Sequence, residues 1–302
     1  MKQRICNRCF LTMTLIYMIL FQSGIGIKEN RFEYKLNVPV QTMILPDTLR
    51  EISGLTNIDS ATFACVQDEN GILFIFDVTK NKLIKQYAFT IDGDYEGIAR
   101  VEDSIYVLRS DGILYEILDY KSPHCKTKTY NTEIPALNNE GLCYDRVQNR
   151  LLIGCKSRVR HEGFDKYERL IYAFDLHTKK LNPKPVIILN VSEIKNFALR
   201  KKISLPSRIN KRGERTDQVL KLKTSAICVH PLTQKLYLLS ACDYMLFVFD
   251  KSGKIEHIEK LDPEIFNKSE GISFFENGDM LISNEAQGKQ ATVLRFEYNH
   301  TK

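Results

Sequence analysis

A short motif that joins an acidic residue, a small residue and an apolar pair recurs along this chain. Its copies are EISGL at Glu51, YEGIA at Glu96, NEGLC at Glu140, SEGIS at Glu270, and TSAIC, in which Ser225 replaces the glutamate. Successive copies along the chain start 45, 44, 85 and 45 residues apart. A repeat of about 40 to 50 residues built from short β segments is typical of the blades of a β-propeller. The doubled step indicates a long insertion or a blade whose motif has decayed.

Each copy continues with two further strand-length runs of apolar residues. In the first copy these are ATFACVQ and GILFIFD, rich in β-branched and aromatic residues. A weaker fourth run follows, such as KLIKQYAFT. The last copy has no room for a fourth run, so we expect residues 33–45 to supply it and to close the ring without an exposed sheet edge. The expected fold class is therefore all-β, a single propeller domain over residues 31–298 closed by an N-terminal strand.

A strongly basic segment, residues 185–223, interrupts the repeats between the third and fourth legible strand sets. Its stretch from Lys195 to Lys223 holds ten Lys and Arg against two acidic residues, whereas the whole chain has a net charge of +6. SEIKNFALRKK within it predicts a short amphipathic helix capped by Ser192. The segment is either a solvated insertion or a docking surface for lipid head groups or acidic polysaccharide. Nucleic acid is not expected as a partner, because aromatic residues are not interleaved with these charges.

The N-terminal segment, residues 1–26, reads as a signal peptide or membrane anchor. Lys2, Arg4 and Arg8 precede an apolar run over residues 10–21, which small residues follow. The run is shorter than the roughly 20 residues that span a bilayer as a helix. We therefore expect an exported protein of the periplasm or cell envelope, tethered to the membrane if the segment is retained.

Six cysteines remain once this leader is set aside. They contain no C-x-x-C pair, which leaves a metal knuckle or a redox motif without support. A domain of this size does not need disulfides for stability, so we expect most of these cysteines to be small buried apolar residues.

The repeats resemble those of the SdiA-regulated family of bacterial exported β-propellers. The resemblance rests on EISGL with QDENGILFIFD, on YEGIA and NEGLCYD, and above all on the final stretch LDPEIFNKSEGISFFENGDMLISNEAQGKQATVLRF. It implies a six-bladed propeller at the envelope of a Gram-negative bacterium, and it implies no established reaction. Five blades are legible here, so a sixth would have to come from residues 181–224 and the N-terminal strand.

Propeller geometry predicts where the repeated glutamates lie. The first strand of each blade lines the central channel, so the strand starts should converge on one mouth. We expect a metal site there, with calcium as the candidate cofactor, formed by Glu51, Glu96, Glu140 and Glu270. Ligand-binding residues are expected around it at the ends of second strands, namely Asp68, Arg109, Lys156 and Asn284. Two structural alternatives are a network of these glutamates with basic residues, and glutamates that only bind backbone N–H groups of the next blade.

Two functions fit these observations. The first is an envelope binding or scaffold protein, a monomer that holds an envelope component or an anionic ligand at the channel mouth and contacts the membrane surface through the basic segment. The second is a calcium-dependent hydrolase of phosphoesters or lactones, by analogy with other propellers. The six histidines share no spacing and no hydrolase motif occurs, so catalysis is the less favoured function.

Overall fold

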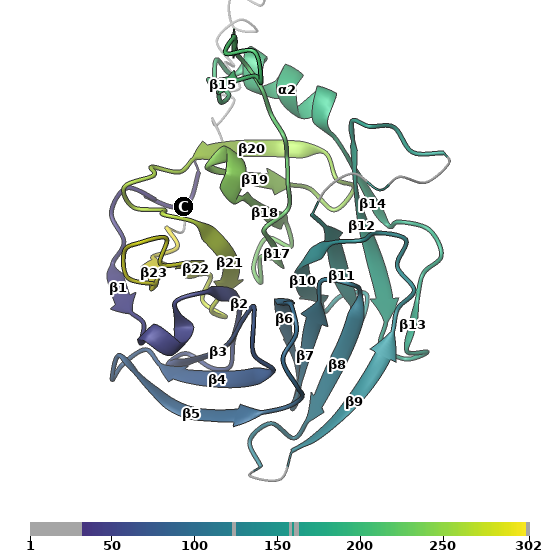
Figure 1. Ribbon diagram of the computed structural model, residues 1–302, viewed down its shortest axis with the longest axis vertical. Helices are drawn as coiled ribbons and strands as arrows, with labels where there is room; N and C mark the ends of the chain where they lie inside the picture. The colour runs from purple at the N-terminus through teal and green to yellow at the C-terminus, as the bar shows by residue number, and fades with distance from the viewer. Residues whose placement is uncertain (1–31, 123–124, 157–158, 160–162, 300–302) are drawn as a thin grey trace, which may run out of the picture. The chain divides into compact units, whose positions relative to one another are not determined.

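The computed structural model describes residues 32–122, 125–156, 159 and 163–299, and the predicted leader lies outside them. Five antiparallel sheets are arranged as blades around a common axis, each with its first strand innermost (Figure 1). The predicted propeller is thus confirmed, with the five blades that the repeats make legible. The expected sixth blade is wrong, because residues 181–224 add a strand to the third blade and then form a helix and a small hairpin.

Blades 1, 2 and 4 are four-stranded meanders. Blade 1 consists of β2 (Ile52–Asn57), β3 (Thr62–Gln67), β4 (Ile72–Asp77) and β5 (Lys82–Ala88). Blade 2 consists of β6 (Tyr95–Val101), β7 (Ser104–Arg109), β8 (Ile113–Leu118) and β9 (Lys126–Asn131). Blade 4 consists of β17 (Ala226–Val229), β18 (Leu236–Ser240), β19 (Met245–Phe249) and β20 (Ile255–Lys260). Two short 3₁₀ helices, η1 (Asp47–Leu49) and η2 (Ala241–Asp243), lie in the connections.

Blades 3 and 5 depart from this plan. In blade 3 two strands share the outer edge, so its members are β10 (Asn139–Asp145), β11 (Arg150–Cys155), β12 (Glu168–Asp175), β13 (Lys180–Leu181) and β14 (Ile187–Asn190). In blade 5 the outer strand comes from the other end of the chain, so its members are β21 (Ser269–Phe274), β22 (Met280–Asn284), β23 (Thr292–Phe296) and β1 (Gln41–Ile44). β1 pairs antiparallel with β23, which confirms the predicted closure.

Tyr34, just before β1, fixes this closure from the inside. Its hydroxyl donates to the Gly278 carbonyl at 2.6 Å and lies 2.7 Å from Nε2 of His230. Nδ1 of His230 accepts from the backbone N–H groups of Leu232 and Thr233, so the ring proton is on Nε2 and is donated to Tyr34. Burial lowers the pKa of His230 to about 4, which keeps this link neutral at physiological pH.

The basic segment forms α2 (Val191–Arg200) and the hairpin β15 (Arg208–Ile209) with β16 (Arg215–Thr216). The predicted helix is confirmed, but its predicted cap is wrong. Asn190 caps the helix, because its side-chain oxygen accepts from the backbone N–H groups of Ser192 and Glu193. In the described ranges no helix is long and apolar enough to cross a bilayer.

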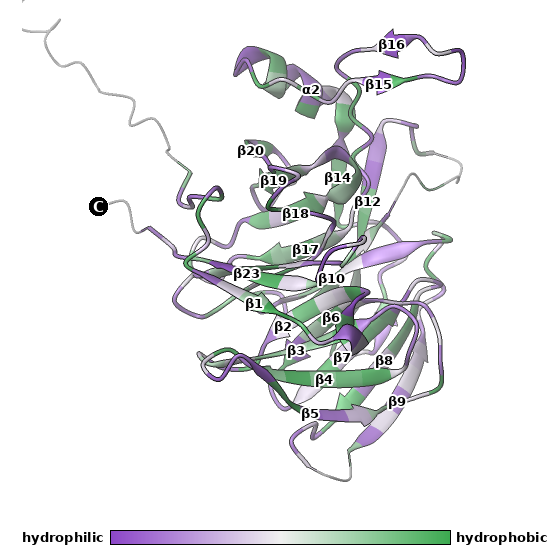
Figure 2. Cartoon of the chain, turned by 60° about the vertical axis from the view of Figure 1, so that its left-hand side comes forward, coloured by the Kyte–Doolittle hydropathy of each residue, from purple (hydrophilic) through white to green (hydrophobic). Residues whose placement is uncertain are grey.

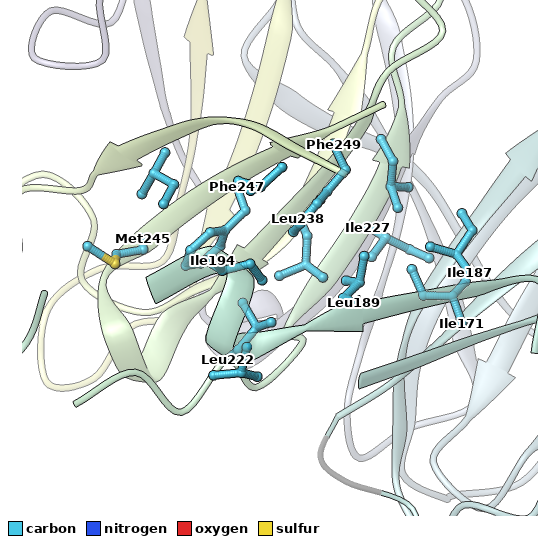
Figure 3. Packing of buried hydrophobic residues seen from close by; sticks show 14 of the residues in the cluster. Ile171, Ile187, Leu189, Ile194, Leu222, Ile227, Leu238, Met245, Phe247 and Phe249 are labelled. Carbon is cyan, nitrogen blue, oxygen red and sulfur yellow. The ribbon is translucent and has the colours of Figure 1, made fainter. Parts of the chain in front are cut away.

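The hydrophobic core lies between neighbouring blades. One cluster joins blades 3 and 4 through Ile171, Leu238 and Phe247, and Ile194 of α2 packs onto it (Figure 3). Inner strands such as β4 are buried along almost their whole length, whereas the outermost β5 alternates between exposed and half-buried residues. Figure 2 shows β4 as mainly hydrophobic and β5 as more hydrophilic. This pattern is expected where neighbouring blades cover the inner strands and the outermost strand of each blade faces solvent. The six cysteines within the described residues are free thiols, and three of them are buried.

Candidate functional site

The starts of the innermost strands and the loops after the second strands meet at one end of the channel. Backbone bonds tie each loop to the next blade, as from Tyr95 N to Asp68 O at 2.9 Å and from Thr224 N to Lys156 O at 3.1 Å. This end is called the glutamate mouth below. Among the described residues, its charged side chains include six carboxylates and two lysines, namely Glu51, Asp68, Glu96, Glu140, Glu270, Glu285, Lys156 and Lys268.

A glycine follows the repeated glutamate because the blades approach closely there. A Cβ atom on Gly97 would lie 2.7 Å from the Cβ of Leu142 in the next blade, which is closer than side chains pack. In blades 2, 3 and 5 the strand pairing shifts by one residue at this glutamate, forming a bulge. A bulge changes the direction in which the side chain of its extra residue points. The blades are therefore better aligned on the glycine than on the glutamate.

Alignment on this glycine corrects the placement of Glu51. In blade 1 the pairing of Leu55 with Cys65 puts Gly54 at the glycine position, so Ser53 takes the place of the glutamate. Glu51 precedes β2 and approaches the mouth from its rim, where it lies near the Asp68 carboxyl and helps to raise its pKa. The ring position itself therefore holds three glutamates and, in blades 1 and 4, Ser53 and Ser225.

Two lysines neutralise part of the mouth. Lys156 forms an ion pair with Glu140, whose side chain is almost completely buried. Lys268 bridges Glu285 at 2.6 Å and Glu270 at 3.2 Å. Burial raises the pKa of Glu270, and the lysines oppose that rise. The predicted structural network named Arg109, Lys156 and Arg158 as the basic partners. Within the described residues the pair of Lys156 with Glu140 fits it, Arg109 pairs elsewhere, and Arg158 lies outside the described residues.

Glu96 and Asp68 have no such partner, because neither forms a salt bridge within the described part of the chain. Burial raises the pKa of Glu96 to about 7; Asp94, Glu270 and Asp68 add to the rise, and Lys156 opposes it. Burial raises the pKa of Asp68 to about 6, with further contributions from nearby carboxylates. Like charges in one small space disfavour the ionised form of each, so the mouth carries an excess of negative charge.

Arg109 and Asn284, both predicted to bind ligand, are engaged elsewhere. Arg109 forms a two-point ion pair with Asp111 in its own turn and donates to the Tyr115 hydroxyl. Asn284 is 1% exposed and lies within blade 5, where Ser269 donates to its side-chain oxygen at 2.9 Å. Asp68 and Lys156, by contrast, do join the glutamates.

The channel behind the glutamate mouth is closed. The cavity there measures about 10 Å³ and is walled by the apolar residues that follow the repeat glycine, such as Ile98 and Leu142. A single water molecule needs about that much space. A ligand of the mouth therefore binds from outside, in a shallow cup.

The opposite end of the channel opens into a separate cavity of about 100 Å³. Side chains two residues after the repeat glycine accept backbone N–H groups of the next blade, namely Thr56 from Arg100 (3.1 Å), Cys143 from Val229, Cys228 from Phe274 and Ser273 from Asn57 (3.1 Å). Ala99 is the equivalent residue of blade 2, and it has no acceptor to offer Tyr144. The Cys228 thiol also donates to the Val229 carbonyl, so these two cysteines have a structural role in the contacts between blades.

Among the residues that the structure describes, no three Asp, Glu, His or Cys side chains are placed to share one metal ion. Of the four glutamates of the predicted calcium site, Glu140 and Glu270 each pair with a lysine. Glu51 lies at the rim and Glu96 forms no salt bridge within the described residues.

Sequence reasoning missed Lys268, which pairs with both Glu270 and Glu285. The signal for Lys268 was its position two residues before the repeat glutamate, on the same side of a β segment.

Comparisons with known proteins bear on the fold. No protein-family model matches the chain, and no curated protein matches its sequence. Among solved structures, glutaminyl cyclase of Myxococcus xanthus is 11% identical with a TM-score of 0.54, over 87% of this chain and 96% of that one. The PQQ-bound aldose sugar dehydrogenase of Streptomyces coelicolor is 11% identical with a TM-score of 0.54, over 86% of this chain and 97% of that one. At such low identity these likenesses show that the chain has a β-propeller fold, and they show nothing finer.

Proposed function

We propose that this propeller is a binding or scaffold protein whose glutamate mouth receives a positively charged group. The observation that supports this most is the pair of carboxyls, Glu96 and Asp68, that have raised pKa values and no salt bridge in the described residues. Each would gain a counter-charge if a cation entered the mouth. The neighbouring carboxylates that add to the rise of these pKa values also create a negative potential, and that potential attracts a cation.

The charge balance favours a cation over the anionic ligand expected from Arg109 and Lys156. Lys156 is committed to Glu140, and Arg109 to its own turn. Within the described part of the mouth these six carboxylates face two lysines, so an anion would meet repulsion from them. The shallow cup further favours a small ion or the charged end of a larger partner, such as an amine of an envelope component.

Calorimetric titration with calcium chloride, and separately with spermidine, tests this proposal. We expect binding at about pH 8, where both carboxyls are ionised, and weaker binding at about pH 5, where protons occupy them. The double variant Glu96→Gln, Asp68→Asn should lose the binding. Glu297→Gln, at an exposed glutamate on the C-terminal segment, is the matched control. Absence of binding by both cations at the higher pH would refute the proposal.

A calcium-dependent hydrolase of phosphoesters or lactones is the second candidate. Its support is Glu96, because a carboxyl with a pKa of about 7 suits general acid or base catalysis near neutral pH. Hydrolysis of p-nitrophenyl phosphate and of γ-butyrolactone, with calcium or with chelator, would measure it. Activity that needs both calcium and Glu96 would favour the enzyme over the binding protein.

Export to the periplasm or cell envelope, and membership of the SdiA-regulated family, complete the proposal. They rest on the order of charged, apolar and small residues in positions 1–26 and on the quoted repeats. Fractionation of cells that produce the full chain, with detection of the protein in the periplasm, membranes or cytoplasm, tests the location.

A further inference from the structure

The basic segment forms a platform on the outer side of blade 4. α2 packs against this blade through buried residues such as Ile194 and Ala198, and Leu222 adds to the same cluster (Figures 2 and 3). The hairpin β15–β16 follows the helix and extends beside it (Figure 2). Together α2, the hairpin and the strand-free residues up to Lys223 are called the basic platform.

A buried carboxylate ties the platform to the propeller. The Asp243 side chain is completely buried and accepts from Arg208 of β15 at 2.7 Å. It also accepts from the backbone N–H groups of Lys221 and Leu222 and from the hydroxyl of Ser240 at 2.8 Å. Charge-assisted bonds of this kind hold geometry well. The platform is therefore a built surface with a defined position on blade 4.

The charges on the platform are displayed to solvent. Of its ten basic residues only Arg208 and Arg215 form a salt bridge within the described structure. The others include Lys201 at the end of the helix and Lys211 and Arg212 at the turn of the hairpin, all of them exposed. Such a surface attracts negative charge over about a Debye length.

Two large apolar side chains stand exposed among these charges. Leu199 of α2 is 58% exposed and Ile209 of β15 is 76% exposed. Leu199 directly precedes Arg200, and Ile209 lies two residues before Lys211. A soluble acidic polymer offers no apolar region in which such side chains could be buried. A lipid bilayer does, because its acyl chains lie beneath a layer of charged head groups.

We propose that the basic platform docks the protein on an anionic lipid membrane. The lysines and arginines contact phosphate head groups, while Leu199 and Ile209 enter the boundary between head groups and acyl chains. The glutamate mouth plays no part in this contact, so the proposal stands apart from the proposed cation site. Membrane docking would hold the propeller at a surface even without its N-terminal segment.

Vesicle co-sedimentation of the full chain tests the docking. We expect binding to vesicles of phosphatidylcholine mixed with phosphatidylglycerol that exceeds binding to phosphatidylcholine alone and falls as salt is added. The triple variant Lys201→Gln, Lys211→Gln, Arg212→Gln should weaken binding to the mixed vesicles by about a hundredfold, from about fivefold for each charge near the surface.

A matched control removes the same charge from another side of the ring. Three exposed lysines lie on outermost strands distant from α2, namely Lys82 of β5 and Lys126 and Lys128 of β9 (Figure 1). The triple variant of these lysines to Gln should bind the mixed vesicles as the natural chain does. Circular dichroism checks that every variant is folded.

The apolar contribution is measured separately with Leu199→Ser, Ile209→Ser at high salt, where charge attraction is screened and the loss should be clearest. Equal losses in the platform and control variants would overturn the proposal, as would binding that ignores phosphatidylglycerol. Binding to dextran sulfate through the same residues, without binding to vesicles, would overturn it in favour of an acidic polymer.

Discussion

Replacement of Glu96 by Gln should stabilise the protein at alkaline pH. The structure raises the pKa of this carboxyl from 4.5 to about 7, mainly through burial. A carboxyl with a raised pKa binds its proton more tightly in the folded state than in the unfolded state. Its contribution to stability is therefore complete below about pH 4.5 and is lost as pH rises through about 7.

The size of this loss follows from the shift. A difference of about 2.5 pH units corresponds to roughly 3 kcal/mol once the carboxyl is ionised in both states. Gln mimics the protonated carboxyl, so Glu96→Gln should gain up to roughly that amount at about pH 8 and almost nothing at about pH 4.5. The gain is an upper limit, because neighbouring carboxylates readjust when one is removed.

Urea unfolding followed by circular dichroism measures this effect, since the chain has no tryptophan to report fluorescence. The free energy of unfolding is compared between the natural chain, Glu96→Gln and the control Glu297→Gln at the two pH values. A gain by Glu96→Gln that is equal at both pH values, or a loss at the higher pH, would refute the electrostatic reasoning.

Three further substitutions test the structure. Lys156→Gln should destabilise the fold by about 3 kcal/mol, because it leaves the buried carboxylate of Glu140 unpaired, and urea unfolding measures the loss. Ala99→Ser should raise stability by about 1 kcal/mol by giving the backbone N–H of Tyr144 an acceptor, and an unchanged melting temperature would contradict the ring of inter-blade bonds. Tyr34→Phe should cost about 1 to 3 kcal/mol, because Nε2 of the buried His230 loses the hydroxyl to which it donates, and a thermal melt at neutral pH checks this.

The propeller was predictable because its repeated residues are those required where neighbouring blades pack closely. The glycine position recurs since a Cβ atom on Gly97 or Gly271 would collide with the next blade. Glu51 was misaligned because its motif, EISGL, has an acidic residue two positions before the serine that the bulge places at the ring. Periodicity in a sequence counts residues, whereas a bulge changes which face a residue points to.

The composition of the site was less predictable than its place. Sequence order indicated which strand ends gather at one mouth, and Asp68 and Lys156 are indeed there. It could not show that Asn284 turns into its own blade or that Arg109 pairs within its own turn, because those outcomes depend on side-chain contacts at short range. Blade number likewise depends on how residues 181–224 pack, and they follow no strand repeat.

The pKa of Glu96, measured with and without a cation, tests directly whether the glutamate mouth binds a positively charged group. Carbon NMR of the glutamate carboxyls, assigned by comparison with Glu96→Gln, follows the titration of this group. We expect a pKa of about 7 for Glu96 alone and a lower pKa once calcium or spermidine is added. An ordinary glutamate pKa, or a raised pKa that neither cation lowers, would contradict a cation-binding mouth.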